Sequence, residues 1–263
     1  MIVFSAIVPH SPLLIPTIGR NEREKLTDTL RAYTEIEHAL YAAKPETLVV
    51  ISPHAHMYPD SFSGNMCECF EGVLKEFGDH STTIKTSVDF LLLDHIHRAL
   101  REEQIPFTLT SQQELDYGCT VPLLLLTTKL THWKCVPLAP SLLGPQAHYE
   151  FGREVARVLQ RENRRIAVLA SADLSHHVNA QSPQGMRPEG IAFDTAIRSA
   201  VVTRHHAELI GLDATMCDKA GQCGYQPILA FMGMIADVSG IMREVCYEAP
   251  FGVGYMTALF EQT

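Results

Sequence analysis

The sequence predicts an α/β protein with a mostly parallel central sheet flanked by helices, and three observations lead to this prediction. Apolar, β-branched runs of strand length recur along the chain. Amphipathic segments of helix length lie between them. No Gly/Ser linker, low-complexity tract or repeat of fixed period divides the 263 residues. We therefore expect one domain over residues 1–263.

The first elements form a β–α–β unit. Residues 2–8 (IVFSAIV) are an apolar run of strand length that Pro9 closes. Residues 21–44 carry apolar side chains at helical spacing with charges between them. Residues 47–52 (TLVVIS) are apolar and β-branched, as in a strand that is covered on both faces. The order strand, helix, strand predicts a parallel pair.

The remaining segments continue this alternation to the end of the chain. Apolar periodicity and length predict five further helices, at 90–104, 121–130, 147–163, about 189–202 and 226–240. Four further strands are expected at 134–142, 165–171, 243–250 and 254–262.

Composition excludes several classes of protein. The net charge is −9, and no basic run is longer than the five residues 161–165 (RENRR), so we expect no nucleic-acid partner. The seven cysteines are odd in number and include no C-x-x-C pair, which argues against a disulfide framework and favours a reducing cytoplasm. Neither a phosphate-binding glycine loop nor a G-x-S-x-G nucleophile elbow is present.

The sequence also predicts that the protein is not inserted in a membrane. No apolar run reaches the ~20 residues of a membrane-spanning helix. The apolar N-terminal segment lacks a basic n-region and a small-residue cleavage site, so it is interpreted as a first strand and not as a signal peptide. We expect a cytoplasmic protein without a membrane partner.

Three of the predicted strands end in histidines. The first strand leads to His10, the second to His54, and the strand at 165–171 to Asp173, His176 and His177. Ligands of open α/β sheets bind outside the carboxyl ends of the strands. If these strands are parallel, His10, His54 and His176 converge at one edge of the sheet. Proline precedes both His10 and His54 and stiffens each turn.

Converging neutral histidines serve either metal binding or acid–base chemistry. Two histidines and a carboxylate form the facial site of non-haem Fe(II) oxygenases, which leaves positions open for substrate and dioxygen. A pocket without metal that uses its histidines as acid–base groups is the other interpretation of the same pattern.

Five segments, in order, resemble the class III extradiol ring-cleavage dioxygenase (LigB-type) superfamily, and most closely its Memo-like branch, which occurs in prokaryotes beside radical-SAM partners. The resemblance covers essentially the whole chain. The segments are PHSPLLIPTIG (9–19), VVISPHAHMYPDSF (49–62), LASADLSHH (169–177), AGQCGYQPILAFMG (220–233) and YEAPFGVGYMTALF (247–260).

The resemblance implies roles for individual residues. His10 and His54 match the two histidine ligands of Fe(II), and His176 matches the histidine that acts as acid and base toward the catechol. The third ligand of the true dioxygenases is a glutamate, whereas this chain offers Gln222 and Cys223. Cys223 followed by glycine is similar to the metal-binding region of the animal Memo proteins. Fe(II) is the metal implied first, and a thiolate ligand would favour zinc or copper.

Other residues near these motifs are assigned to the substrate or to structure. Related proteins often have His-Gly where this chain has Tyr117 and Gly118, so Tyr117 is expected to face the substrate. Asp173 and His177 are also placed on the substrate side. Glu248 is an alternative carboxylate ligand, although a structural role at the end of a strand is the favoured interpretation.

Two functions follow from the resemblance. The first is a non-haem metal-dependent dioxygenase that uses O2 to open the ring of a catechol-type or related small aromatic, an oxidoreductase. The second is a Memo-like protein that binds metal through His10, His54 and Cys223 for metal handling or partner docking, without ring cleavage. His176 favours the first, and the missing glutamate favours the second. The resemblance also implies a homodimer or pairing with a second subunit.

Overall fold

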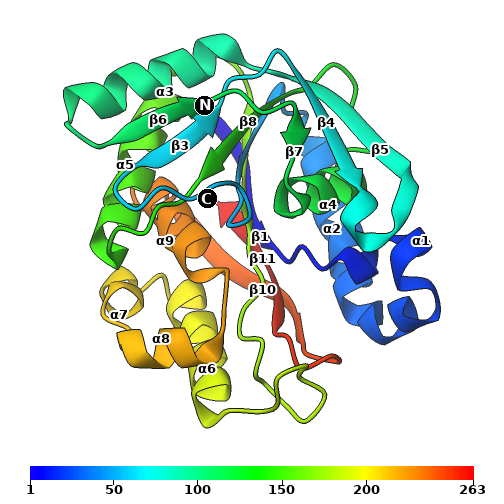
Figure 1. Cartoon of the computed structure of the whole chain (residues 1–263). Coiled ribbons are helices and arrows are strands. Elements are labelled where there is room, and N and C mark those ends of the chain that lie inside the picture. Colours follow the sequence, from blue (N-terminus) through cyan, green and yellow to red (C-terminus); the bar gives the residue numbers. More distant parts are fainter.

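An 11-stranded mixed sheet with helices on both faces forms the framework of the computed structural model, which describes residues 1–263 (Figure 1). The strands are β1 (Ile2–Val8), β2 (Thr47–Ile51), β3 (Phe62–Asn65), β4 (Cys69–Leu74), β5 (Asp79–Val88), β6 (Phe107–Thr110), β7 (Glu114–Leu115), β8 (Lys134–Ala139), β9 (Ile166–Ser171), β10 (Gly240–Glu248) and β11 (Tyr255–Gln262). Their order is β10-β11-β1-β9-β2-β8-β5-β4-β7, and β3 pairs with β6 and β8. Six of the ten pairings are parallel, so the predicted fold class is confirmed.

The centre of the sheet consists of β1, β9 and β2, which are parallel neighbours. Every residue of β2 and β9 is buried, as expected for apolar strands that helices cover on both faces. Val8 lies opposite Ser171, and Ile51 lies opposite Ala170. The three strands therefore end level with one another, and the loops that follow them start at the same edge of the sheet.

Helices pack against both faces of this sheet. They are α1 (Pro16–Gly19), α2 (Thr27–Ala43), α3 (Phe90–Glu102), α4 (Tyr117–Leu126), α5 (Pro145–Arg161), α6 (Pro188–Val202), α7 (His206–Ile210), α8 (Ala214–Ala220) and α9 (Tyr225–Met234), with 3-10 turns at Pro12–Leu14, Arg20–Leu26 and Lys75–Phe77. Figure 1 shows α2 and α4 on one side of the sheet and α5, α6 and α9 on the other.

The predicted helices at 90–104, 147–163 and 189–202 correspond to α3, α5 and α6. The helix predicted at 121–130 is displaced: α4 begins earlier because the Asp116 carboxylate accepts a hydrogen bond from the Cys119 N–H and caps the helix. The helix predicted at 226–240 ends early, at Met234.

Residues 62–115 contain five strands that the sequence analysis did not predict. The antiparallel pair of β4 and β5 is the largest part of this region. The sequence of β5, DHSTTIKTSV, is mostly polar and partly exposed, so it lacks the apolar signal of the central strands. The strands β3, β6 and β7 have only four, four and two residues.

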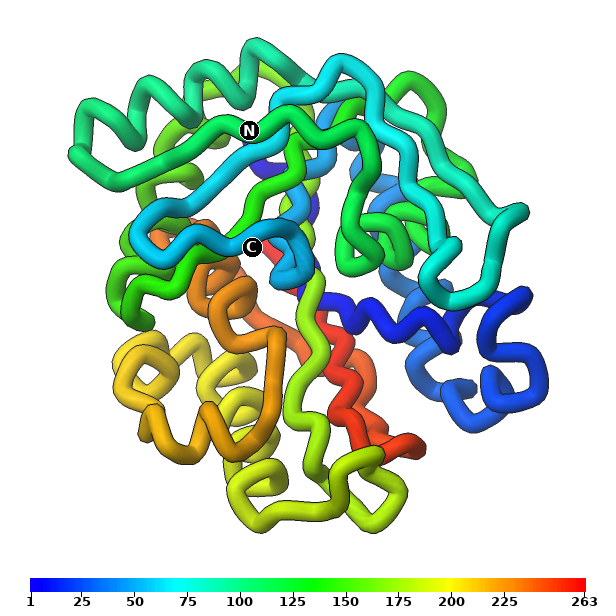
Figure 2. Tube along the Cα trace, in the orientation of Figure 1, coloured from blue at the N-terminus to red at the C-terminus, as the bar shows by residue number.

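A long loop, 172–187, joins β9 to α6 and lies along the turn between β10 and β11, as the tube in Figure 2 shows. The Leu174 N–H donates to the Gly254 carbonyl at 2.8 Å, and the Gly254 N–H donates to the Ser175 carbonyl at 2.8 Å. Gly252 has φ 72, and a β-carbon there would collide with Ser182 of this loop. The C-terminal hairpin therefore fixes the loop that carries His176.

No helix of this structure combines the length and the apolar character that crossing a bilayer requires.

Candidate metal centre

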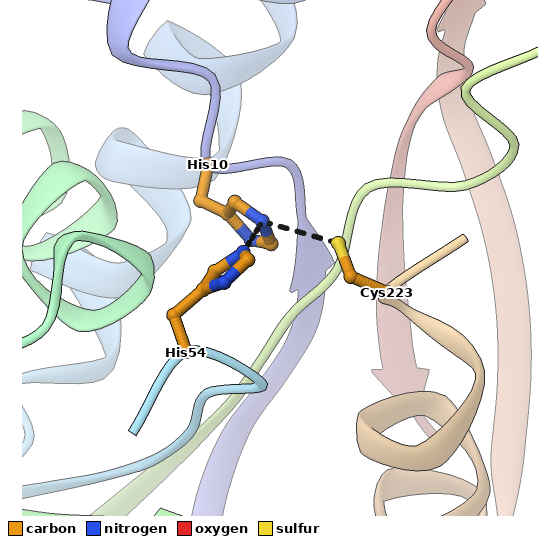
Figure 3. Close-up of side chains that lie close together, drawn as sticks. All are labelled: His10, His54 and Cys223. Atoms are coloured by element: carbon orange, nitrogen blue, oxygen red, sulfur yellow. Dashed lines mark hydrogen bonds between the residues drawn. The ribbon is translucent and has the colours of Figure 1, made fainter. Parts of the chain in front are cut away.

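Three potential metal ligands from separate parts of the chain meet at the carboxyl ends of β1 and β2 (Figure 3). The His10 and His54 Nε2 atoms are 2.9 Å apart, and the Cys223 Sγ lies 3.4 Å from the His10 Nε2. All three donor atoms lie within 4.8 Å of one another. Ligand atoms around a four-coordinate metal such as zinc are separated by about 3.3–3.6 Å. The distance from His10 to Cys223 falls in this range, whereas the two imidazole nitrogens are at hydrogen-bond distance and closer than that.

The ring of His10 is oriented by a chain of two hydrogen bonds. The Ser171 hydroxyl donates to the Gly118 carbonyl at 2.5 Å. Its single hydrogen is therefore used, and it accepts a hydrogen bond from His10 Nδ1 at 2.8 Å. This fixes the proton on Nδ1 and leaves the lone pair of Nε2 facing Cys223 and His54. The His10 backbone is held as well, because its N–H donates to the Asp173 carboxylate at 2.8 Å.

The Gly118 carbonyl is free for this role because of Pro122. In an α-helix the N–H of residue 122 would bond to the carbonyl of residue 118, and proline has no N–H. Pro122 lies inside α4, so the Gly118 carbonyl turns to the Ser171 hydroxyl instead. A proline in α4 thereby sets the direction of the hydrogen bonds that orient His10.

His54 is held from both sides. The Ser52 hydroxyl donates to the Asp116 carboxylate and lies near the His54 N–H, at 3.4 Å from the nitrogen. The Tyr117 ring stacks on the imidazole with centroids 4.1 Å apart and 24° between the planes. Gly118 leaves room for this packing, since a β-carbon there would lie 3.2 Å from His54 Cδ2 and collide with Ser52.

Cys223 lies in the short connection between α8 and α9. Gly224 permits the close approach of this connection to β9, because a β-carbon at Gly224 would crowd the backbone of Ala172 and Asp173. The neighbouring Gln222 uses its side-chain oxygen to accept a hydrogen bond from the Tyr225 N–H at 2.7 Å. The Glu248 carboxylate accepts from the Thr29 N–H at 2.7 Å, at the start of α2. Cys223 belongs to the group of converging donors, whereas Glu248 does not.

Burial keeps the imidazoles neutral. Burial, and the proximity of His176, lowers the pKa of His10 to about 3. Burial, followed by the charges of His10 and His176, lowers the pKa of His54 to about 3. Burial and the nearby Asp173 raise the pKa of the Cys223 thiol. Neutral imidazoles are the form that binds a metal, and a cation in this position would also stabilise the thiolate.

His176 lies beside this group with an unsatisfied nitrogen. Its backbone N–H donates to the Ala220 carbonyl at 3.0 Å, while the ring nitrogen Nε2 is buried without a hydrogen-bond partner. Burial lowers the pKa of His176, and the Asp173 carboxylate opposes that shift. A buried polar atom without a partner is rare and marks a position where a ligand can bind.

Asp173 and His177 are also buried near this edge. Burial raises the pKa of Asp173 to about 6, against the hydrogen bond from the His10 N–H. Its second oxygen is 3.7 Å from the His10 Nε2. The His177 ring is used differently, because Nδ1 donates to the Gly185 carbonyl at 2.7 Å and holds the loop 172–187.

A cavity of 630 Å³ opens beside His54 and Tyr117. Its walls come from the loop after β2, from β3, β6, β7, α4 and β8, and from the 3-10 turn at Lys75–Phe77. The volume falls within the range of about 300–1,000 Å³ that is typical of small-molecule sites. The candidate metal centre therefore has a neighbouring space of the size that an organic substrate needs.

Sequence reasoning named His10, His54, His176 and Cys223, as well as Asp173 and Tyr117 beside them, but it missed Ser171 and Asp116. Ser171 has no signal in the sequence, because only strand pairing reveals that it faces His10. Asp116 had a signal, since an aspartate before an apolar run is a typical helix cap. The cavity was not predicted, because several of its walls come from the strands between residues 62 and 115.

Comparisons with known proteins agree with this architecture. The chain is 25% identical over 258 residues to Protein CA_C1420 of Clostridium acetobutylicum, covering 95% of this chain and 55% of that protein. It is 24% identical over 157 residues to 2,3-dihydroxyphenylpropionate/2,3-dihydroxicinnamic acid 1,2-dioxygenase 1 of Dechloromonas aromatica, covering 56% of this chain and 47% of that enzyme. The chain thus spans about half the length of these curated relatives.

The fold matches a solved structure as well. The uncharacterized protein JW3007 from Escherichia coli K12 superposes with a TM-score of 0.69 at 15% identity, over 98% of this chain and 100% of that one. The model of the family described as the catalytic LigB subunit of aromatic ring-opening dioxygenase matches residues 5–258. The chain therefore belongs to the LigB family, that of the catalytic subunits of aromatic ring-opening dioxygenases.

Proposed function

We propose that the protein is a metal-dependent dioxygenase that opens the ring of a catechol-type or related aromatic substrate with O2. The observation that carries this proposal is the convergence of His10, His54 and Cys223 beside the unpartnered Nε2 of His176. Membership of the LigB family and the resemblance of part of the chain to a dioxygenase support it.

The side chains fit a divalent transition metal. Two neutral imidazoles and a thiol converge from three segments, and the hydrogen bond from His10 to Ser171 directs a lone pair at the common point. A bound ferrous ion would supply electron transfer between a chelated diol and O2. We assign the third ligand to Cys223 rather than Gln222, because the Gln222 oxygen is used by the Tyr225 N–H.

His176 is the proposed acid–base residue. Its imidazole is held neutral by burial, so it can accept the proton that a diol releases on binding. The unpartnered Nε2 is the atom that would hold this proton, with the Asp173 charge stabilising the cation that results. The buried surroundings exclude water from this transfer. Tyr117, which stacks on His54 at the cavity wall, would pack against the substrate.

Cys223 also favours a second function. A thiolate with two imidazoles suits zinc or copper better than Fe(II), for which a carboxylate is the usual third ligand. The same site could therefore bind a softer metal for metal handling or partner docking, without ring opening. Substitution of His176 distinguishes the two functions, because only the dioxygenase needs a proton acceptor.

The test compares wild type and His176→Ala, loaded anaerobically with Fe(II) and then given O2 and simple catechols. Ring cleavage yields a yellow product. His176→Ala should lower turnover by about 10²–10⁴-fold while keeping the metal. His80→Ala, a change at an exposed histidine of β5, is the control. A wild-type protein that holds iron but forms no product with any catechol would contradict the proposed activity, and metal loss in His176→Ala would contradict the assigned role.

A further inference from the structure

The cavity beside the metal centre has an uneven charge. Among its lining residues are the carboxylates Glu76 and Glu114, and no lysine or arginine. Glu76 comes from the 3-10 turn after β4, and Glu114 comes from β7. Neither glutamate forms an ion pair. The wall of the cavity therefore carries two carboxylates that no ion pair neutralises.

The third carboxylate of the wall, Asp116, and the Asn65 amide are already engaged. Asp116 accepts hydrogen bonds from the Ser52 hydroxyl and the Cys119 N–H. Asn65 exchanges two hydrogen bonds with the backbone of Gln112, at 2.8 and 2.9 Å. Glu76 and Glu114 are the charged groups that remain available to a ligand.

Lys85, a basic residue of β5, is used elsewhere. Lys85 of β5 pairs with Glu71 at 3.4 Å and does not line the cavity. Glu71 lies opposite Glu114 in the pairing of β4 with β7. Lys85 is therefore committed to the neighbouring carboxylate.

Aromatic and apolar side chains also line the cavity. Tyr117 presents its ring between His54 and the edge of Phe77, whose centroid is 5.1 Å away. Tyr58 lies across from His56 with ring centroids 4.6 Å apart, and Leu115 adds a buried aliphatic surface. A ring can pack against the aromatic part while a substituent extends to the carboxylates. Aromatic faces also attract a cation.

We propose that the substrate is an aromatic diol with a positively charged amine substituent, held by Glu76 and Glu114, and not a diol with a carboxylate. The inference rests on the proposed function, because it takes the diol to be bound at the metal centre. A carboxylate substituent would meet two like charges without a cation to bind it. An ammonium group would find two carboxylates and aromatic faces. The Dechloromonas relative is named for acids, 2,3-dihydroxyphenylpropionate and 2,3-dihydroxicinnamic acid, so the proposed preference differs from that name.

The expected size of the preference for an amine over a carboxylate depends on how exposed Glu76 and Glu114 are. Both glutamates are exposed to solvent, so salt and water weaken their attraction. We expect an affinity ratio of about tenfold or more between a cationic and an anionic substituent of equal length, since the two charge states differ in sign. The ratio should shrink as the ionic strength rises.

The test measures binding rather than turnover. Zinc-loaded protein is titrated, without O2, with three catechols that share a two-carbon chain at the same ring position and end in an amine, a methyl group or a carboxylate. The wild type should bind the amine most tightly and the carboxylate least. Glu76→Gln with Glu114→Gln should lower the amine-to-carboxylate ratio by about tenfold. Glu102→Gln with Glu103→Gln removes the same charge from the exposed end of α3 and should preserve the ratio.

Equal binding of the amine and the carboxylate, or a ratio that the Glu76/Glu114 substitutions leave unchanged, would overturn the proposal. Binding of none of the three compounds would overturn it as well. Failure of the iron-loaded protein to open any ring, with the amine preference intact in the zinc-loaded protein, would overturn the dioxygenase function alone.

Discussion

Pro122 and Gly118 are four residues apart in α4, and the missing N–H of the proline leaves the Gly118 carbonyl without its helical partner. That carbonyl accepts the Ser171 hydroxyl at 2.5 Å, and Ser171 in turn accepts from His10 Nδ1. One missing backbone N–H in a helix thus determines which nitrogen of His10 is free to bind a metal.

Pro122→Ala should weaken metal binding. The new N–H competes with Ser171 for the Gly118 carbonyl, so the direction of the bond to His10 is no longer fixed. We expect a several-fold increase in the metal dissociation constant, measured by competition with a chromogenic chelator. The new helical hydrogen bond stabilises by about 1 kcal/mol and offsets the loss of the buried ring. Pro145→Ala, at the first position of α5, adds an N–H that has no helical carbonyl to bond to, and is the control. An unchanged dissociation constant in Pro122→Ala would show that Pro122 does not control the orientation of His10.

Ser171→Ala should lower metal affinity by about 10–100-fold, the usual effect of losing the partner that orients a ligand histidine. The same chelator competition measures it. Ser5→Ala on the adjacent strand β1 is the matched control, because the Ser5 hydroxyl is equally buried and has no hydrogen-bond partner. If both variants bind metal as the wild type does, Ser171 does not orient His10.

Cys223→Asp should change which metal the site prefers. Aspartate is close to cysteine in length and supplies a hard oxygen ligand with the same charge as a thiolate. We expect the ratio of Fe(II) to zinc bound from an equimolar mixture to rise by about tenfold or more, because thiolates select softer metals. Elemental analysis of the loaded protein measures this ratio. Cys217 is a buried core residue and is therefore not used for the control. Cys246→Asp, outside the cluster, should leave the ratio unchanged.

Arg164→Met should destabilise the fold in a manner that depends on pH. Burial opposes ionisation of Asp89, but hydrogen bonds from Arg164, Thr47 and the Leu92 N–H outweigh burial and lower the Asp89 pKa. A lowered carboxyl pKa contributes stability that is present above the unfolded value of about 3.9 and is lost as the pH falls through the folded value. We expect a loss of about 2 kcal/mol in the free energy of unfolding at pH 7.

Urea unfolding at a series of pH values measures this effect. The difference between wild type and Arg164→Met should shrink once the pH falls below about 4, as Asp89 becomes protonated. Arg98→Met removes an exposed pair with Asp94 and should cost less than about 0.5 kcal/mol at every pH. A difference for Arg164→Met that is independent of pH would show that packing, and not the ion pair, is responsible.

The central part of the fold could be predicted because its residues carry strong local signals. The strands β1, β2 and β9 are buried apolar runs, and α3, α5 and α6 are amphipathic with recognisable ends. The parallel order of these strands then brings His10 and His54 to one edge, as the pattern of strand ends indicates.

The five strands from β3 to β7 could not be predicted, for a physical reason. These strands are short or polar, and several of them pair with residues far away in sequence, as Glu71 with Glu114 and Phe62 with Phe107. The cavity, which these strands help to line, could therefore not be predicted from local sequence patterns. The same applies to Ser171, whose role depends on the pairing of β9 with β1 and on the packing of α4.

The central claim is that His10, His54 and Cys223 bind one metal ion. The most direct test is the metal content of protein purified and reconstituted anaerobically, by elemental analysis, for wild type, His54→Ala, Cys223→Ser and His56→Ala. We predict about one ion per chain in the wild type and in His56→Ala. His54→Ala and Cys223→Ser should each lose most of it. A wild-type protein that retains no metal, or a content that the His54 and Cys223 substitutions leave unchanged, would contradict the claim.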